Sequence, residues 1–559
     1  MNVSDLLIHL LAAHGVRRIF GIPGDVIDDL MEAIRRQGEI RFIGVRQEEA
    51  GAFAASAEAK LTGGLAACVG TAGPGAIHLL NGLYDAKRDH APVIAITGQE
   101  ASGFIGTEAH QEVDLERLFF DVAVYSETVT NAAQAPEVLI RACHAAIADR
   151  GIAHVSIPTD VAGKRVAFDQ CRPSSAARPG HIVPAAEDCA AAGALLRSAR
   201  KVAILAGTGC AGAGDALVAF ALKAKAPIVR SLRAEEVIDD DHPLCVGGLG
   251  LLSDRPEAEA MANAMADCDL LVMVGGDFPD LELYPQSAKA IQIDTEPTRI
   301  GRRRPVDVGL VGQAGPTLEA LTAALDDGRD GSFLGAMQSE RARWRASRDA
   351  AEASTDRPIN ATALMRAIVE VAPDDTIFLA DSGTATAWTA RHLRIRPGQR
   401  YILSGGPTSM AFAFPGAIGA QLAYPERRVI AIAGDGAFAM LLGDFVTAVE
   451  YRLPIVTVVL DNGGLGFIGL EREAKGLPAW GSDLLDPDFA AVAEASGGFG
   501  RRVEAAEEMG AALAEALAAG KPAVLEVRVN REELVMPPEI SLSQAADFGL
   551  AEIGQAFRR

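Results

Sequence analysis

Two polar residues, Asp435 and Asn462, stand where apolar runs typical of β-strands come to an end. Asp435 directly follows RVIAIAG, and Asn462 follows the next such run, PIVTVVLD. If the two runs flank a helix in a βαβ unit, both strands point the same way and both side chains emerge at one edge of the sheet. A carboxylate and an amide at that edge, with the carbonyl of Gly464, supply the hard oxygen ligands that Mg²⁺ prefers, and phosphate oxygens would complete its coordination.

Glycines on both sides of Asp435 favour the same chemistry. Gly434 and Gly436 carry no Cβ, so the backbone between strand and helix can approach a diphosphate at the helix N-terminus. Each turn taken alone is more typical of an ordinary loop, because Asp-Gly and Asp-Asn-Gly-Gly are common turn sequences. Taken together, the two turns predict a site for a diphosphate carried on a divalent cation.

The elements that must position this site follow from the rest of the pattern. Short β-rich runs alternate with Ala- and Leu-rich stretches along the chain, which predicts an α/β protein with parallel sheets covered by helices. Two stretches break the alternation: residues 168–186, rich in Pro, Ser and Ala, and residues 326–358, mostly polar and charged. They divide the chain into three expected doubly wound parallel-sheet domains and a tail: 1–165, 187–325, 359–530 and 531–559.

The composition is that of a globular protein, since 49% of the 559 residues are hydrophobic and 23% are charged. The formal net charge of −22 argues against nucleic acid as a partner, because it repels phosphate backbones. We expect no membrane span, since no apolar run approaches the roughly 20 residues that one requires. The start of the chain lacks the pattern of a signal peptide, and the seven cysteines form no CxxC pair, so we expect a cytoplasmic protein.

With the diphosphate site in place, the sequence resembles the thiamine-diphosphate-dependent 2-oxo acid enzymes, whose hallmark is Gly-Asp-Gly followed, after a helix and a strand, by Asn-Asn. Here Asp461 replaces the first Asn, while Asn462 and Gly464 keep the positions expected to bind Mg²⁺ with Asp435. Further segments carry the resemblance over nearly the whole chain: FGIPGD at 20–25, RQEEAGAFAASAEAKLTG at 46–63, TAGPGAIHLLNGLYDAKRDHAPVIAITG at 71–98, DSGTATAW at 381–388 and PTSMAFAFPGAIGAQ at 407–421.

The resemblance implies that Glu48 is a catalytic residue. In this family the glutamate at that position contacts the cofactor's pyrimidine across a subunit interface and promotes loss of the thiazolium C2 proton. Such a task needs a carboxyl group that is shielded from water. From the residues alone, Glu48 and Glu49 are two acids that favour a helix N-terminus. The His that usually precedes this glutamate is Gln47 here.

The resemblance also implies how the cofactor is held. Met410 matches the bulky apolar residue that wedges under the cofactor and forces its two rings into a V, although a Met in an apolar loop is more often core filling. Thr408 is expected to contribute only its backbone carbonyl, and backbone amides and hydroxyls after the strand TIFLA to bind the diphosphate. The expected thiamine diphosphate contacts are Asp381, Ser382, Gly383, Thr384, Thr408, Ser409, Met410, Gly434, Asp435, Gly436, Ala437, Asn462, Gly464, Leu465 and Gly466.

The middle of the chain looks most like the bacterial pyruvate oxidases that pass electrons to a quinone and hold FAD there. The expected flavin contacts are Gly207, Gly209, Arg233, Gly275 and Asp294, and Phe467 is expected beside the flavin side of the thiamine site. Each has a plainer interpretation, because a glycine-rich turn is common after any strand and a Phe is often core.

Two departures bear on the flavin. Ala234-Glu235 replaces a Gly-Lys pair of the relatives, which reverses a charge, and Gln313 replaces an Asp. In the first domain, the segment that carries a His-His pair in simple decarboxylases has only His110, so proton delivery to the product is poorly supported.

The resulting hypothesis is oxidative decarboxylation of pyruvate or a close 2-oxo acid by a protein using thiamine diphosphate, Mg²⁺ and FAD. Electrons would pass to a quinone-type acceptor, and the chain would form a homodimer or homotetramer. The tail stops short of the amphipathic extension of the quinone-reducing relatives, so membrane contact is expected to be weak or absent. The alternative is a non-redox decarboxylase or carboligase resembling acetolactate synthase.

Overall fold

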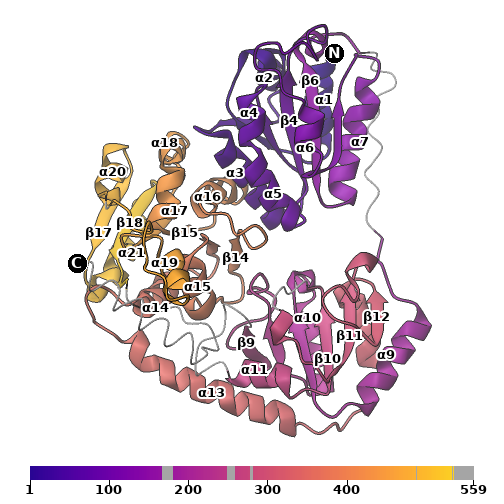
Figure 1. Ribbon diagram of the computed structural model, residues 1–559, viewed down its shortest axis with the longest axis vertical. Helices are drawn as coiled ribbons and strands as arrows, with labels where there is room; N and C mark the ends of the chain where they lie inside the picture. Colours follow the sequence, from indigo (N-terminus) through magenta and orange to yellow (C-terminus); the bar gives the residue numbers. More distant parts are fainter. Residues whose placement is uncertain (167–179, 249–258, 277–280, 486, 532, 534–559) are drawn as a thin grey trace.

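The computed structural model describes residues 1–166, 180–248, 259–276, 281–485, 487–531 and 533. It contains three parallel six-stranded sheets with helices on their faces, which confirms the predicted α/β class (Figure 1). The predicted tail falls almost wholly on residues 534–559, so the expectation of weak membrane contact lies outside the described residues. Within the described part of the chain, no helix has the length and hydropathy needed to cross a membrane.

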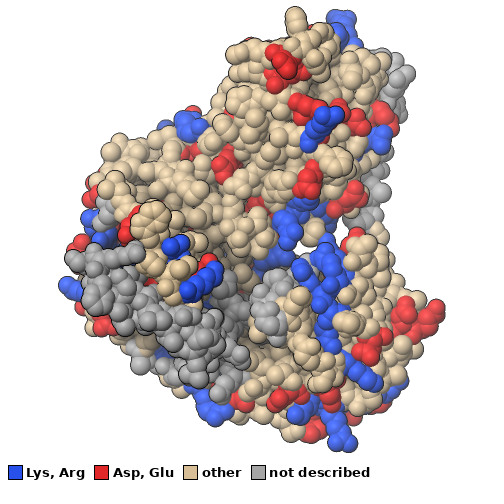
Figure 2. Space-filling model, viewed as in Figure 1, with Lys and Arg blue, Asp and Glu red and all other residues tan. Residues whose placement is uncertain are grey.

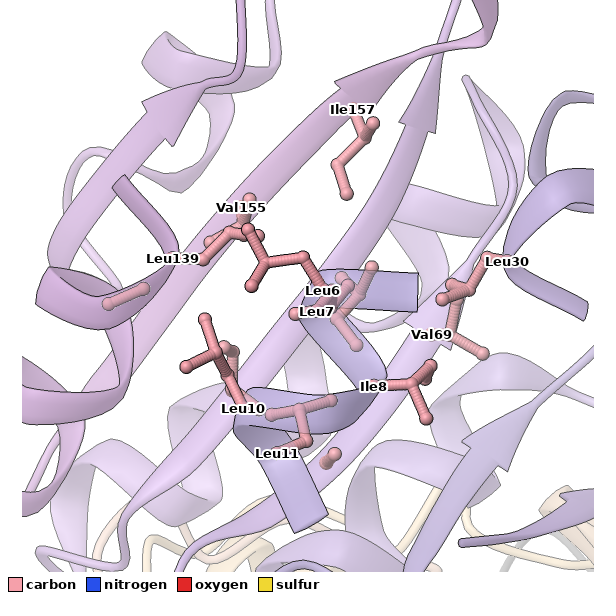
Figure 3. Packing of buried hydrophobic residues seen from close by; sticks show 14 of the residues in the cluster. Leu6, Leu7, Ile8, Leu10, Leu11, Leu30, Val69, Leu139, Val155 and Ile157 are labelled. Atoms are coloured by element: carbon pink, nitrogen blue, oxygen red, sulfur yellow. The ribbon is translucent and has the colours of Figure 1, made fainter. Parts of the chain in front are cut away.

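The first domain builds its sheet in the order β2-β1-β3-β4-β6-β5. Its strands are β1 Arg18–Gly21, β2 Arg41–Gly44, β3 Ala66–Gly70, β4 Val93–Gln99, β5 Ala123–Thr128 and β6 Ile152–Pro158. Its helices are α1 Val3–Ala13, α2 Asp28–Gln37, α3 Glu48–Thr62, α4 Pro74–His78, α5 Leu80–Arg88, α6 Leu115–Phe119, α7 Ala135–Ala148 and α8 Thr159–Ala162. Figure 3 shows the leucines of α1 packed against Leu139 of α7 and Val155 of β6, which buries the apolar face of this helix.

The middle domain has the strand order β12-β11-β10-β7-β8-β9. Read from the other edge, its strands follow 3-2-1-4-5-6, the order of dinucleotide-binding folds, with β7 and β10 at the point where the order reverses. Its strands are β7 Val202–Ala206, β8 Ile228–Arg230, β9 Cys245–Gly248, β10 Leu270–Val274, β11 Lys289–Asp294 and β12 Val308–Val311. Its helices are α9 Ala186–Ser198, α10 Gly214–Ala224, α11 Glu259–Ala266 and α12 Ala314–Ala323.

The third domain repeats the order of the first, β14-β13-β15-β16-β18-β17. Its strands are β13 Ile377–Ala380, β14 Arg400–Leu403, β15 Val429–Gly434, β16 Val456–Asp461, β17 Phe499–Val503 and β18 Ala523–Arg528. Its helices are α14 Ala361–Val371, α15 Thr384–His392, α16 Ala413–Ala423, α17 Asp435–Met440, α18 Phe445–Glu450, α19 Gly466–Glu473, α20 Phe489–Ala495 and α21 Met509–Ala518. A short 3₁₀ turn, Leu442–Asp444, joins α17 to α18.

The first and third domains share a core where α3 packs against α16 (Figure 1). Phe53 of α3 meets Phe412, which directly precedes α16, edge to face at 5.8 Å between ring centroids. A Cβ at Gly419 would lie 2.1 Å from the carbonyl oxygen of Ala54, so only glycine lets the two helices approach this closely. This contact fixes how the two domains that carry the expected site residues meet within one chain.

Most of the polar stretch 326–358 is a helix, α13 Ser332–Glu352, which runs from the middle to the third domain (Figure 1). Arg341 and Arg345 of α13 hold the buried carboxylate of Asp240 at 3.0 and 2.6 Å. Arg341 also lies over the ring of Trp344, 4.1 Å from its centroid. These charge contacts attach the helix to the middle domain.

Candidate active site

Asp435 and Asn462 meet at the edge of the third sheet, as their spacing predicts. Asp435 is the first residue of α17 and Asn462 follows β16. The amide of Gly464 donates to Asp435 Oδ2 and to Asn462 Oδ1, at 3.1 Å in each case. Two oxygens expected to bind a cation therefore converge on one backbone amide.

A divalent cation fits this donor set. Burial raises the pKa of Asp435 to about 6, and the charge of Asp461 adds to the rise, so a nearby cation would stabilise the ionised carboxylate. Among the described residues, no three His, Cys, Asp or Glu side chains cluster as a metal centre. A bound Mg²⁺ would rely on Asp435, Asn462 and the Gly464 carbonyl, with phosphate oxygens as further ligands.

Asp461, which replaces the Asn of the hallmark, is held by groups other than these ligands. Its side chain is buried at the end of β16, where it pairs with Arg528 of β18 and accepts the amide of Gly463 at 3.2 Å. The charge introduced by the replacement is thus met by an arginine on the neighbouring strand.

The neighbouring helix ends leave room for a diphosphate. β13 and β15 are adjacent in the sheet at the point where the strand order reverses, and α15 and α17 begin just after them. A Cβ added at Gly383 or at Gly434 would meet nothing within 4 Å, so open space lies beside both helix N-termini. Amides of Thr384 and Ala437 lie in the first turns of these helices, where anions bind.

Asp381 shapes the site through another loop. Its buried carboxylate accepts the amides of Ser382, Ala411 and Ala413 at 2.8, 2.8 and 3.1 Å. Burial raises its pKa to about 7, and these backbone hydrogen bonds oppose the rise. Ser382 Oγ donates to the carbonyl of Ser409 at 2.9 Å. Asp381 and Ser382 therefore hold the segment 408–413 in place rather than offering free groups to a diphosphate.

The segment 408–413 places Met410 beside Gly436, on the side of the site where a diphosphate is expected. Thr408 and Ala411 both adopt left-handed backbone conformations, with φ of 51° and 69°, which turn the chain on either side of Met410. The Met410 Cε atom would lie 3.7 Å from a Cβ at Gly436, and Leu465 Cδ2 would lie 2.9 Å away. Met410, Gly436 and Leu465 therefore line one small region above α17.

Gly466 and Phe467 begin α19 beside this region. A Cβ at Gly466 would lie 2.7 Å from Asn462 Nδ2 and 3.3 Å from Thr384 Cγ2, so glycine is needed for Asn462 to sit here. The Phe467 side chain is half-buried and packs against the core of the third domain. This packing is the plainer of the two interpretations made from the sequence, and a role beside a flavin stays a prediction.

Glu48 lies in the first domain as the first residue of α3, and only 6% of it is exposed. Its Oε2 atom is 2.9 Å from His78 Nδ1. A Cβ at Gly75 would lie 3.1 Å from the other oxygen, Oε1, so the glycine keeps space beside the carboxylate. The shielding from water that the sequence analysis requires of this acid is thus present.

Two polar residues near Glu48 were not predicted. His78 contacts the carboxylate directly, and Asn81 Nδ2 donates to Glu49 Oε1 at 2.6 Å and to Ser409 Oγ at 2.9 Å. Asn81 therefore connects the start of α3 with the loop that carries Met410. The segment AIHLLNG offers no local signal for either role, because both depend on partners that are far away in sequence.

The glycines predicted in the middle domain meet one another at the reversal point of its sheet. The amides of Gly207 and Gly209 donate to the carbonyls of Val274 and Gly275 at 2.9 and 2.8 Å. A Cβ at Gly207 would lie 2.3 Å from the Cα of Gly276, so a close approach of two loops already requires glycine here. Asp294 is buried at the end of β11 and accepts the amide of Glu296 at 2.9 Å.

Arg233, which precedes the altered pair, and Glu235, its second residue, are engaged by protein groups. Arg233 pairs with Asp89 of the first domain at 2.5 Å, and its stem lies against Gly405 of the third. Glu235 is buried and pairs with Arg230 at 3.0 Å. Figure 2 shows Lys and Arg side chains gathered where the first and middle domains meet, in keeping with contacts such as that of Arg233.

Three parts of the chain match thiamine pyrophosphate enzymes. Residues 1–118 match their N-terminal TPP binding domain, residues 189–321 their central domain and residues 381–527 their C-terminal TPP binding domain. The two parts that hold Glu48 and Asp435 are therefore similar to the two TPP binding domains.

Relatives of full length show the same similarity. YdaP of Bacillus subtilis, described as thiamine pyrophosphate-containing, is 40% identical over 98% of this chain and 95% of its own. The pyruvate oxidase of Lactiplantibacillus plantarum is 32% identical over 96% of this chain and 90% of its own. The large subunit of acetolactate synthase isozyme 2 of Escherichia coli is 30% identical over 96% and 97%.

Proposed function

The chain belongs to the thiamine pyrophosphate enzyme family, and from this we propose that it catalyses oxidative decarboxylation of pyruvate or a close 2-oxo acid. The observation that carries the proposal is the convergence of Asp435, Asn462 and the Gly464 amide at the ends of β15 and β16, on one edge of the third sheet. Thiamine diphosphate, when bound, supplies the nucleophilic carbon that attacks the keto group and accepts the electron pair left when CO₂ departs.

Glu48 handles the proton in this proposal. Its carboxylate is shielded from water and lies at the start of α3, and His78 contacts one of its oxygens. A carboxyl group in such a setting can hold a proton at the cofactor's pyrimidine nitrogen and so prepare the cofactor for reaction. Met410 would support the cofactor from below, since it lies beside Gly436 on the diphosphate side.

The diphosphate and its cation are held by the third domain. Asp435 and Asn462 would bind Mg²⁺, and the N-terminal turns of α15 and α17 would bind the phosphate oxygens. Strand ends and hydrogen bonds to the Gly464 amide fix these groups in place. In this proposal they would bind the cofactor, and the proton transfer is left to Glu48.

FAD is the proposed electron acceptor in the middle domain. The strand order 3-2-1-4-5-6 supports it, because dinucleotides bind at the reversal point of such sheets, where Gly207, Gly209 and Gly275 lie. The buried Asp294 at the end of β11 is suited to hydrogen-bond ribose hydroxyls. A quinone-type acceptor would then take up the electrons.

Each complete site would combine two copies of the chain. Apolar side chains are exposed near Glu48, where Ile77, next to His78, is 45% exposed, and near Asp435, where Trp480 and Leu485 are 77% and 89% exposed. Large exposed apolar groups on both halves favour burial against a second copy. We therefore propose a homodimer or homotetramer in which Glu48 of one chain serves Asp435 of another.

A visible spectrum tests the redox proposal. The purified protein should show the absorption of an oxidised flavin, and pyruvate added without oxygen should bleach it when thiamine diphosphate and Mg²⁺ are present. A soluble artificial acceptor should then support turnover, with little stimulation by phospholipid vesicles.

The acetolactate synthase relatives favour a second candidate, a non-redox carboligase or decarboxylase. A protein that takes up no FAD, yet releases CO₂ from a 2-oxo acid and joins two carbonyl compounds, would decide for it.

A further inference from the structure

The turn that precedes Glu48 is held by the third domain of the same chain. The amide of Arg46 donates to Asp444 Oδ1 at 2.9 Å, and the amide of Gly44 donates to Tyr451 Oη at 2.7 Å. Arg46 directly precedes Gln47, the N-cap residue of α3, and Glu48 is the first residue of that helix. Two backbone amides just before the proposed catalytic acid are thus fixed by side chains from another domain.

Asp444 is an unusual residue to find in this contact. It occupies the N-cap position of α18, where an Asp normally accepts an amide of its own helix, but its side chain makes no such bond. Its acceptor oxygen Oδ1 instead receives the Arg46 amide and the hydroxyl of Thr447. The capping group of one domain is therefore diverted to the backbone of another.

The burial of Asp444 makes this arrangement costly. Only 1% of the residue is exposed, and its second oxygen, Oδ2, is buried without a hydrogen-bond partner. Burial raises the pKa of this carboxyl group above its ordinary value. An alanine or a leucine would avoid the desolvation of an unpaired oxygen if docking of the two domains were the only requirement.

We propose that Asp444 is a positioning residue for Glu48, and that Tyr451 assists it by fixing the same turn. Together they set the direction in which α3 begins, and with it the place of the Glu48 carboxylate beside His78. The inference rests on the proposed role of Glu48 in proton transfer.

The same stretch of the third domain also begins the metal site. α17 starts at Asp435, and Asp444 and Tyr451 follow on the next turns of the chain. One continuous segment, residues 435–451, would therefore hold the cation at one end and orient the proton-transfer residue of its own chain at the other.

Asp444→Ala tests the proposal in the holoenzyme, with C2–H exchange of bound thiamine diphosphate as the readout. A small displacement of a reacting group can cost about 100-fold in rate, so exchange should slow about 10- to 100-fold. The affinity for thiamine diphosphate should stay within about twofold of wild type, because Asp435 and the other proposed Mg²⁺ ligands are unchanged. Asp444→Asn keeps an acceptor oxygen for the Arg46 amide and should restore most of the exchange.

A matched control is available on the same interface. Glu450 is half exposed and pairs with the Arg46 side chain at 2.5 Å, so Glu450→Gln removes a contact without touching the backbone amides. Its exchange rate should stay within about twofold of wild type, since exposed ion pairs contribute little. Tyr451→Phe removes only the hydroxyl that accepts the Gly44 amide and should slow exchange by about threefold to tenfold.

Wild-type exchange in loaded Asp444→Ala would overturn the proposal, as would slow exchange that merely parallels lost cofactor affinity. If Asp444→Ala does not fold, wild-type exchange in Tyr451→Phe overturns it. Glu48→Gln measured alongside separates the two hypotheses. Slow exchange in Glu48→Gln with normal exchange in Asp444→Ala refutes only the positioning role, whereas normal exchange in both refutes the role of Glu48 as well.

Discussion

The first and third domains have the same strand order, but equivalent connections carry different residues. The connection after β2 leads to Glu48 and α3, and the connection after β14 leads to Met410 and α16. These two equivalent helices pack against each other. After β15 the third domain has Asp435, while after the corresponding β3 the first domain has Thr71 and no carboxylate. The fold provides the same places twice, and in the proposed mechanism the residues placed there decide which domain transfers a proton and which binds a diphosphate.

The largest expected effect is a fall in reaction rate on substitution of Glu48 in the first domain. Glu48→Gln should lower C2–H exchange of bound thiamine diphosphate by about 10²- to 10⁴-fold, because an amide cannot donate the required proton. Cofactor affinity should change little, since the third domain provides the cation ligands. Measurement of exchange by proton NMR checks this, and exchange at the wild-type rate would remove Glu48 from the mechanism.

Substitutions in the third domain should instead weaken the binding of the cofactor and its cation. Asp435→Ala and Asn462→Ala should each weaken Mg²⁺ and thiamine diphosphate together by at least about 100-fold, because loss of even an outer-shell partner of a metal costs about 10- to 100-fold. Isothermal titration with each component checks the coupling. Unchanged affinity in both variants would show that this edge of the sheet is not the metal site.

A smaller effect is expected at the equivalent connection of the third domain. Met410→Ala should lower turnover by about tenfold while leaving Mg²⁺ affinity intact, because support for the cofactor is lost but its ligands remain. Met410→Leu, which conserves volume, is the matched control and should retain most of the activity. Equal turnover in the alanine and leucine variants would assign Met410 to core filling instead.

The smallest effect concerns stability, at a pair of equivalent strand positions. His154, the third residue of β6, is buried between Thr97 and Ser126, whereas the third residue of the corresponding strand β18 is the apolar Leu525. Burial lowers the pKa of His154 to about 3, so the folded protein keeps it neutral. The unfolded chain binds a proton below about pH 6.5, and the stability that His154 contributes is therefore lost as the pH falls from there towards 3.

At pH 5 this loss amounts to about 2 kcal/mol, since each pKa unit corresponds to about 1.4 kcal/mol. His154→Gln should reduce the drop in thermal stability between pH 7 and pH 5, whatever its effect at pH 7. Melting curves at the two pH values check the difference. An unchanged pH dependence would mean that His154 does not control acid stability.

The sequence predicts the sheets and the meeting of Asp435 with Asn462 at one sheet edge, because the signals are local. Strands follow from apolar runs, and Asp435 and Asn462 stand at the ends of two of them. The roles of His78 and Asp444 could not be predicted, since their partners Glu48 and Arg46 come from distant segments. The helix at 332–352 could not be predicted for a related reason. Its arginines are held by Asp240, and such charge contacts leave no apolar period in the sequence.

The comparison between the domains is tested most directly by mixing two inactive chains. Glu48→Gln and Asp435→Ala chains are co-expressed, and turnover of the mixed dimers is compared with that of each variant alone. If one chain provides the acid and another the cation ligands, random pairing should restore about one quarter of wild-type activity, because half of the dimers are mixed and each has one intact site. Activity no higher than that of the separate variants would contradict a site shared between two chains.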